Sequence, residues 1–336
     1  MEQMTVNSYE ELGLTKQDLL AMYETMVRAR KIDERMWKLN RAGKIPFVVS
    51  CQGQEAAQVG AAFALEKGID YVLPYYRDVA VVLHFGQTSR DLMLSAFAKA
   101  EDPNSGGRQM PGHFGSKEHR IVTGSSPVTT QVPHAVGIAL AAKMKKEELV
   151  TFVSFGEGSS NQGDFHEGAN FAGVHKLPVI LFCENNKYAI SVPLTKQLAC
   201  EHVSDRAKGY GMPGVTVDGT DPIAVYAVVK EARERALRGE GPTLIEAEVE
   251  RLVPHSSDDD DKAYRSAEEL AGLKERDGIQ LFRQRLVNDG IATVDALAEI
   301  DAQIDLEVNE ATTYADKALY ASPESALDYV YEEEKR

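Results

Sequence analysis

A glutamate between two glycines, in Gly156-Glu157-Gly158, is the part of this sequence best suited to bind a charged ligand. A mainly apolar run precedes it, and glycines between a strand and a helix typically let a phosphate approach the backbone. Because the carboxylate of Glu157 would repel a phosphate, the pattern predicts a divalent cation between them. Asn186, at the end of the next apolar run, adds an amide oxygen, and a nearby backbone carbonyl would complete the protein ligands that Mg²⁺ prefers.

The two apolar runs and the segment between them predict a single β-α-β unit. Strands are expected at 149–155 and 178–183, because neither run alternates with polar residues, as is typical of parallel strands covered on both faces. Ser159 and Ser160 are candidates for the N-cap of the intervening helix. The buried face of this helix is expected to carry Phe165, Ala169, Ala172 and Val174.

Several motifs around this unit occur together in one known family. The spacing of Gly156-Glu157-Gly158 from Asn185-Asn186 resembles the thiamine diphosphate signature. The segments 107–115, 125–131, 185–191 and 251–258 resemble, in the same order, those of the E1 α subunit of 2-oxo acid dehydrogenase complexes. The resemblance runs from about Thr15 to Tyr264 and is greatest to the branched-chain members.

The resemblance implies a thiamine diphosphate-binding fold and assigns roles to individual residues. Glu157, Asn186 and the Tyr188 carbonyl are implied to hold Mg²⁺. The residues implied to contact the cofactor are Tyr76, Arg77, Ser126, Val128, Gly156, Glu157, Gly158, Ser159, Asn186 and His255. A potassium ion is implied at Ser125, Pro127, Thr130 and Gln131, and the implied catalytic residues are His113 and His255.

Three of these residues also have a plainer interpretation. Arg77 follows two tyrosines at an expected strand end, where it could be a surface charge or could fork a phosphate. His113 lies in a glycine- and proline-rich segment, 101–132, where it is either an ordinary loop histidine or part of the cofactor entrance. His255 precedes four aspartates, Asp258–Asp261, which predict a solvated, mobile loop; it could neutralise phosphate or relay protons.

The activity implied by the resemblance is decarboxylation of a 2-oxo acid with transfer of the acyl group to a lipoyl group. In the family, a glutamate of a separate β subunit activates the aminopyrimidine ring, so we expect an α2β2 heterotetramer that meets a lipoylated E2 acyltransferase core. The resemblance also implies that one helix packs against a partner subunit, namely the helix that carries the small residues Gly163, Gly168, Ala169, Ala172 and Gly173. Glu184 replaces an arginine or glutamine that related α subunits often carry, which leaves its contact with the diphosphate open.

Other functions fit parts of the same pattern. Pyruvate or acetoin in place of a branched 2-oxo acid is the nearest alternative, because no residue of this chain alone fixes the acyl group. A NAD-binding oxidoreductase would also use a strand, Gly-x-Gly and a helix. Against it, Asn161 occupies the position of the third glycine, and Glu157 would repel a metal-free pyrophosphate. A purely structural α subunit, without a role in binding cofactor, is disfavoured because the sequence contains a full set of residues expected to bind the metal and the cofactor.

The composition is that of an acidic globular protein. With 336 residues and a formal net charge of −15, the chain lacks the clustered positive charge that nucleic-acid backbones require. Its three cysteines, Cys51, Cys183 and Cys200, suggest neither a disulfide framework nor a zinc site. No apolar run approaches the length of a membrane span, and Met1–Glu11 resembles no targeting peptide, so a cytoplasmic protein is expected.

Beyond the central unit, strands and helices alternate along the chain. Helices are expected at 16–42, 53–66, 78–84, 89–98, 133–147, 197–208 and 222–238, a short strand and turn at 70–78, and further strands at 214–217 and 243–252. This alternation predicts an α/β fold with a mostly parallel sheet, helices on both faces and ligands at the carboxyl ends of the strands. We expect a single domain over 1–336, with an N-terminal helical extension over 1–45 and a C-terminal helical extension over 266–336.

Overall fold

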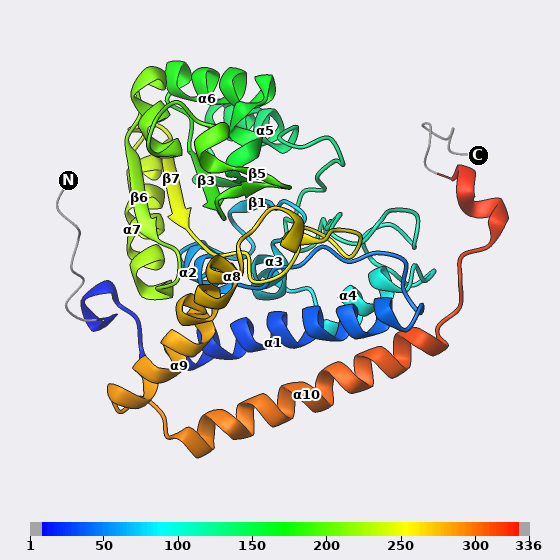
Figure 1. The fold of residues 1–336 in the computed structure, drawn as a ribbon. Coiled ribbons are helices and arrows are strands. Elements are labelled where there is room, and N and C mark those ends of the chain that lie inside the picture. The colour runs from blue at the N-terminus through cyan, green and yellow to red at the C-terminus, as the bar shows by residue number, and fades with distance from the viewer. Residues whose placement is uncertain (1–8, 329–336) are drawn as a thin grey trace.

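The computed structural model describes residues 9–328, which are arranged around one parallel sheet (Figure 1). Five strands are hydrogen-bonded in the order β1-β2-β3-β7-β6, and every neighbouring pair is parallel. They are β1 (Tyr71–Leu73), β2 (Thr151–Gly156), β3 (Val179–Asn185), β6 (Gly214–Asp218) and β7 (Thr243–Glu248). A separate antiparallel pair, β4 (Tyr188–Ala189) and β5 (Val192–Pro193), follows β3.

Helices cover both faces of the sheet, as the sequence predicts. One face carries α5 (Gln131–Lys145) and α6 (Gly163–His175), which lie at the top of Figure 1. On the other side lie α2 (Glu55–Phe63), α3 (Val79–Phe85) and α7 (Pro222–Leu237). The other described α-helices are α1 (Lys16–Arg41), α4 (Ser89–Ala96), α8 (Ala267–Gly272), α9 (Gly278–Asn288) and α10 (Val294–Lys317). No helix among residues 9–328 is long and apolar enough to cross a membrane.

The alternation of side chains along the central strands explains why both faces are covered. In β2, Phe152 belongs to one core cluster and Val153 to the other. In β3, Ile180 and Leu181 divide in the same way. Successive residues of a strand point to opposite faces, so a strand buried on both sides has no polar alternation.

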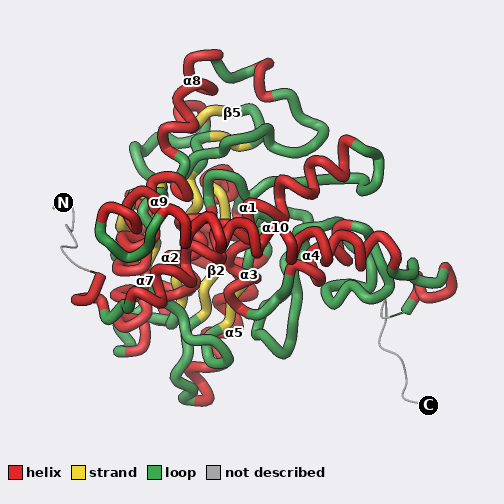
Figure 2. Tube along the Cα trace, turned by 90° about the horizontal axis from the view of Figure 1, so that it is seen from below, coloured by secondary structure: helices red, strands yellow, loops and turns green. Residues whose placement is uncertain are grey.

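The long helices α1 and α10 lie side by side on the far side of α2 and α3 from the sheet (Figure 1), and α4 lies beside α10 (Figure 2). Thr15 caps α1, because its hydroxyl and the Asp18 carboxylate form a reciprocal capping box. Met26 and Val308 are buried in the same core cluster as Phe152 of β2, so both terminal regions join the core on this side of the sheet. Residues 1–8 and 329–336 of the two expected extensions lie outside the described residues.

The small residues of α2 allow close packing against α7. A Cβ atom added at Gly60 would lie 2.4 Å from the carbonyl oxygen of Pro222, at the start of α7. Any side chain at this position would therefore push the two helices apart. The packing matters for the site described below, because α2 carries the buried Gln58.

The structure corrects the sequence-based assignments around α6. Residues 157–161 form a 3-10 helix, η2 (Glu157–Asn161), and α6 begins at Gly163 with Gln162 as its N-cap. Ser159 and Ser160 therefore do not cap α6; the Ser160 hydroxyl instead bonds back to the Glu157 carbonyl. Val174 is exposed, because it lies on the opposite side of α6 from the buried Phe165, Ala169 and Ala172.

Two other assignments also differ. The helix expected at 197–208 is replaced by the 3-10 helices η3 (Leu194–Lys196) and η4 (Val203–Tyr210), because the Ser204 N–H is taken by the buried Glu246 carboxylate. The strand expected at 243–252 is shorter, because β7 ends at Glu248. The short strand and turn expected at 70–78 are confirmed: β1 ends at Leu73, before Pro74, which lacks an N–H, and a turn follows. Further 3-10 helices are η1 (Tyr9–Leu12), η5 (Asp261–Ala263), η6 (Leu273–Arg276) and η7 (Pro323–Leu327).

Candidate cofactor and metal site

The segments that follow β1, β2, β3 and β7 line a cavity of about 500 Å³. This volume is within the usual range for small-molecule and cofactor sites. The predicted site residues that line it are Tyr76, Arg77, His113, Ser125, Ser126, Val128, Gln131, Gly156, Glu157, Gly158, Ser159, Asn186, Tyr188 and His255. Pro127 and Thr130, two of the expected potassium ligands, are not among the residues that line it.

Glu157 and Asn186 meet because they follow adjacent parallel strands, β2 and β3. One carboxylate oxygen of Glu157 accepts a hydrogen bond from the Asn186 N–H, with a distance of 3.3 Å. The amide oxygen of Asn186 in turn accepts the Tyr188 N–H at 3.2 Å. The three residues expected at the metal are thus brought together by the backbone turn that leaves β3.

The chemistry of this corner fits a metal ion held by oxygen atoms. Burial raises the pKa of the Glu157 carboxyl, whose second oxygen has only a long contact of 3.4 Å with the Gln197 amide nitrogen. A buried carboxylate with such weak partners is stabilised by a cation. No group of three or more His, Cys, Asp and Glu side chains that could hold a metal exists in the described part of the chain. Amide, carbonyl and ligand phosphate oxygens would therefore complete the coordination.

Arg77 is buried beside the cavity, with an exposed fraction of 1%. Its Nη1 donates to the Ser50 carbonyl at 2.6 Å, and its Nη2 donates to the His255 carbonyl and to the His255 Nδ1, both at 3.0 Å. Its Nε has no partner, and no carboxylate among residues 9–328 forms an ion pair with it. The structure thus excludes a surface charge and leaves a buried guanidinium suited to an anionic ligand.

The contact with Arg77 fixes the tautomer of His255. A guanidinium can only donate, so Nδ1 accepts and the neutral ring carries its proton on Nε2. Burial lowers the pKa of His255 to about 4, and the positive charges of Arg77 and Arg251 act in the same direction. The imidazole is therefore neutral near pH 7, which favours a proton relay over neutralisation of phosphate.

The loop that follows His255 is held more tightly than its sequence predicts. Asp261 is buried, and the Asp259 carboxylate accepts the His255 N–H at 2.8 Å and the Tyr264 hydroxyl at 2.5 Å. The other two aspartates of the run are exposed. The expectation of four solvated aspartates is therefore wrong for Asp259, whose carboxylate accepts protein donors, and for Asp261, which is buried and pairs with Arg265 at 3.7 Å.

His113 and Ser126 contact each other beside the cavity. His113 Nδ1 lies 2.9 Å from the Met110 carbonyl, and Nε2 lies 2.9 Å from the Ser126 hydroxyl. Because a carbonyl can only accept, Nδ1 is the donor, and a neutral ring then accepts from Ser126 at Nε2. Between α4 and α5 the chain contains no helix or strand apart from isolated bridges, as predicted for 101–132.

The residues expected to bind potassium gather in the turn before α5. The Ser125 hydroxyl donates to the Pro127 carbonyl at 2.9 Å and contacts the Thr130 hydroxyl. Gln131 donates its amide N–H to the Ser154 carbonyl at 3.0 Å. Three oxygen atoms therefore converge, although two of the three belong to residues that do not line the cavity.

The sequence did not reveal the buried residues that form hydrogen bonds to the residues lining the cavity. Gln58 donates to the Arg77 carbonyl at 2.9 Å and to the Glu184 carboxylate at 3.0 Å. Glu184 is buried, accepts the Tyr75 hydroxyl at 3.3 Å and is not among the residues that line the cavity. Phe47 and Val49 do line the cavity, and no motif or periodicity marks them in the sequence.

Comparison with known proteins agrees with this geometry over almost the entire chain. The sequence pattern of the family described as "Dehydrogenase E1 component" matches residues 23–324. The chain belongs to the dehydrogenase E1 component family. This family is thiamine diphosphate-dependent. The resemblance inferred from the motifs around Gly156-Glu157-Gly158 is therefore confirmed.

Relatives of this E1 chain differ in the substrate that their names give. It is 68% identical to the 2-oxoisovalerate dehydrogenase subunit alpha of Bacillus subtilis (strain 168), across 98% of this chain and 99% of that protein. It is 37% identical to the mitochondrial 2-oxoisovalerate dehydrogenase subunit alpha of Mus musculus, across 98% of this chain and 74% of the mouse protein. It is also 37% identical to the pyruvate dehydrogenase E1 component subunit alpha of Staphylococcus aureus (strain Mu50), across 95% of this chain and 84% of that protein.

Proposed function

We propose that this chain is the α subunit of a branched-chain 2-oxo acid dehydrogenase. In this role it takes part in the decarboxylation of branched 2-oxo acids and in the transfer of the acyl group to a lipoyl group of an E2 core. The observation that carries the proposal is the convergence of Glu157, Asn186 and Arg77, from three strand ends, on one cavity. The 68% identity to the Bacillus subtilis protein supports the branched-chain substrate.

The chain's own residues would bind and orient the cofactor. Glu157, Asn186 and the Tyr188 carbonyl would hold Mg²⁺, while Tyr76 and Arg77 would hold the diphosphate. Thiamine diphosphate supplies, when bound, the nucleophilic carbon and the electron sink for loss of carbon dioxide. The remaining proposed contacts are Ser126, Val128, Gly156, Gly158 and Ser159, and the proposed potassium ligands are Ser125, Pro127, Thr130 and Gln131.

His255 and His113 are the proposed catalytic residues. The proton on His255 Nε2 gives a neutral donor that could serve in acyl transfer to the lipoyl group. His255→Ala should then lower the rate with a lipoylated acceptor more than the rate with an artificial electron acceptor. Equal activity of the variant and the wild type in both assays would leave this histidine without a catalytic role.

A partner subunit would supply what the chain lacks. Glu157 is the one carboxylate among the described residues that line the cavity, and the metal would occupy it. A β subunit, in a cytoplasmic α2β2 heterotetramer, would provide the carboxylate that activates the aminopyrimidine. The exposed Phe171 and Val174 of α6 offer apolar surface for such a partner. Gly168 and Gly173, by contrast, allow α6 to approach Val132 and Tyr210 within the chain.

The two-subunit proposal predicts that the isolated chain binds cofactor weakly and turns over no substrate. Co-expression with the β subunit should restore decarboxylation, because the second carboxylate then enters the site. The assay compares the purified single chain with the co-purified assembly on the same 2-oxo acid. Robust decarboxylation by the single chain, purified to homogeneity, would contradict the proposal.

Pyruvate and acetoin are the alternative substrates. The 37% identity to a pyruvate dehydrogenase α subunit supports pyruvate as the alternative to test. The cavity favours a larger acyl group, since Phe47, Val49, Met110 and Ile190 line it. One methylene in an apolar pocket changes discrimination by about 1–3 kcal/mol, so activities on related acids should overlap. We expect kcat/KM of the assembly to be highest for the 2-oxo acids derived from valine, leucine and isoleucine. A higher value for pyruvate or acetoin would overturn the substrate assignment.

A further inference from the structure

The guanidinium of Arg77 is anchored to a segment that has no regular secondary structure. Arg77 Nη1 donates to the backbone carbonyl of Ser50 at 2.6 Å, and Ser50 belongs to the extended stretch 47–51 before α2. A carbonyl in such a stretch is a useful anchor only if something else fixes its backbone. The second anchor of Arg77 is His255, which itself lies in a loop.

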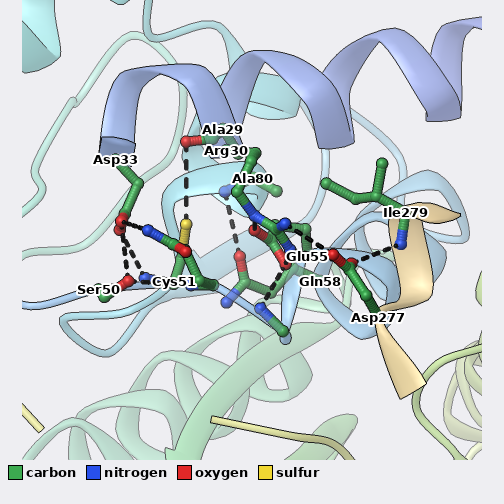
Figure 3. Close-up of polar contacts among 12 residues, drawn as sticks. Ala29, Arg30, Asp33, Ser50, Cys51, Glu55, Gln58, Ala80, Asp277 and Ile279 are labelled. Carbon is green, nitrogen blue, oxygen red and sulfur yellow. Dashed lines mark hydrogen bonds and ion pairs between the residues drawn. The ribbon is translucent and has the colours of Figure 1, made fainter. Parts of the chain in front are cut away.

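A carboxylate from α1 fixes this segment. Asp33 accepts hydrogen bonds from three successive residues: the Ser50 hydroxyl at 2.8 Å, the Cys51 N–H at 2.8 Å and the Gln52 side-chain amide at 2.7 Å. Figure 3 shows Asp33 reaching from α1 toward Ser50 and Cys51. Asp33 is 2% exposed, and Arg30, the nearest cation on α1, is already paired with Glu55 and Asp277.

Burying the Asp33 carboxylate costs free energy, and the hydrogen bonds that offset this cost indicate its role. A buried carboxylate without a direct cation costs several kcal/mol unless hydrogen bonds compensate for the lost water. Here the three compensating donors all come from the residue that binds Arg77 and its two successors. Immobilising a long, flexible side chain costs about 1.5–2 kcal/mol in lost rotamer freedom, and fixing it before the ligand arrives lowers the cost of binding.

We propose that Asp33 is a positioning residue for Arg77, and that it acts through the Ser50 carbonyl to hold the guanidinium ready for the cofactor diphosphate. The proposal rests on the proposed role of Arg77. It adds to the binding machinery a side chain from α1, a helix that contributes no residue to the lining of the cavity.

A double-mutant cycle in the co-expressed α and β assembly tests this coupling. Asp33→Asn and Arg77→Met are made singly and together, and thiamine diphosphate binding is measured by calorimetry at saturating Mg²⁺. In Asp33→Asn the new side-chain NH₂ faces a group that is itself a donor, so one of the hydrogen bonds that fix Ser50 is lost. Arg77 is then held less firmly, and the affinity for thiamine diphosphate should fall about tenfold. The variant should raise KM for the cofactor about tenfold and leave kcat at saturating cofactor within about twofold of the wild type. In the Arg77→Met background, Asp33→Asn should cause no further loss of affinity.

Asp70→Asn is the matched control. Asp70 is also a buried carboxylate that accepts backbone N–H groups, from Glu66 at 2.7 Å and Val150 at 2.9 Å, and unlike Asp33 it also pairs with Arg233 at 2.7 Å. It lies just before β1, at the opposite end of that strand from Arg77. Asp70→Asn should lower the melting temperature and leave the affinity for thiamine diphosphate unchanged. A general loss of structure would instead weaken binding in both aspartate variants, which would overturn the proposal.

The outcomes separate this proposal from the function on which it rests. If Arg77→Met binds the cofactor as tightly as the wild type, the role of Arg77 fails and the proposal fails with it. If Arg77→Met weakens binding but Asp33→Asn does not, or if the two losses simply add, only the role of Asp33 is overturned. Should Asp33→Asn fail to assemble, Ser50→Ala removes one donor to Asp33 and keeps the carbonyl. It is expected to weaken affinity about threefold, again only when Arg77 is present.

Discussion

Two arginines of this chain, the partly buried Arg30 and the buried Arg77, have opposite electrostatic surroundings. Arg30 lies between two carboxylates, with nitrogen to oxygen distances of 2.6 Å to Glu55 and 2.9 Å to Asp277 (Figure 3). Arg77 contacts two carbonyl oxygens and the ring of His255, and no carboxylate in the described chain pairs with it. The charge of Arg30 is matched within the fold, whereas that of Arg77 is left for an anionic ligand.

The same difference separates the glutamates. Glu55, on α2, is bound to Arg30, while Glu157 receives only long hydrogen bonds from Asn186 and Gln197. The two groups with unmatched charge, Glu157 and Arg77, line the same cavity and have opposite signs. A diphosphate carried with a metal ion would match both: the anion meets Arg77 and the cation meets Glu157.

The largest expected effect comes from removing the matched arginine. Arg30→Met leaves the buried Glu55 and the partly buried Asp277 without a cation, and breaking a buried pair such as Arg30–Glu55 costs about 3–5 kcal/mol. We expect a large drop in the melting temperature of the α and β assembly, with the affinity for thiamine diphosphate unchanged well below that temperature. Calorimetric melting and titration of the same preparation give both values. An unchanged melting temperature would show that the ion pairs of Arg30 contribute little to the fold.

The next largest effect comes from the unmatched arginine. Arg77→Met should weaken thiamine diphosphate binding by about tenfold to 150-fold, since hydrogen bonds to charged groups contribute about 1.5–3 kcal/mol. Folding stability should not fall, because no carboxylate loses its partner. Titration calorimetry and thermal melting of the assembly measure the two quantities. A variant that melts like Arg30→Met but binds cofactor normally would reverse the distinction between the two arginines.

A smaller effect is expected at the opposite side of the cavity. Glu157→Gln and Asn186→Ala each remove or weaken one oxygen ligand and should weaken cofactor binding about tenfold at limiting Mg²⁺. Excess Mg²⁺ should recover part of the loss, and folding stability should change little. Titrations at two Mg²⁺ concentrations distinguish this from a general loss of structure. Unchanged affinity of both variants at limiting Mg²⁺ would rule out the proposed metal site.

The smallest expected effect is on the pH dependence of stability. His255 has a pKa of about 4 in the folded chain, against about 6.5 in an unfolded chain. As the pH falls from 6.5 to 4, the unfolded chain takes up a proton that the folded chain does not, so stability is lost over this window. His255→Gln removes this contribution. Its melting temperature should therefore differ less between pH 7 and pH 5 than that of the wild type. An equal difference in both proteins would contradict the neutral state assigned to His255.

The sequence predicts the charged side of the site well, because the relevant signals are local. Gly156-Glu157-Gly158 and Asn186 each follow an apolar strand, and parallel strands bring their carboxyl ends together. The ends of helices and strands are less predictable. Residues 157–161 form a 3-10 turn because the Ser160 hydroxyl bonds back to the Glu157 carbonyl, a choice that its residue type does not reveal.

The supporting residues could not be predicted, because they act across long stretches of chain. Asp33 holds Ser50, Ser50 holds Arg77, and Arg77 holds His255, with sequence separations of 17, 27 and 178 residues. Gln58 reaches Glu184 across 126 residues. No periodicity or motif connects such positions, and their partners become visible only when α1, α2 and the sheet are packed together.

The most direct test of the account is a titration of thiamine diphosphate into the assembled α and β subunits, first with Mg²⁺ and then after its removal by a chelator. Wild type, Arg30→Met and Arg77→Met are compared below their melting temperatures. We predict that thiamine diphosphate binding requires Mg²⁺, is retained in Arg30→Met and is weakened at least tenfold in Arg77→Met. Binding that is indifferent to the chelator, or equally strong in Arg77→Met and the wild type, would contradict it.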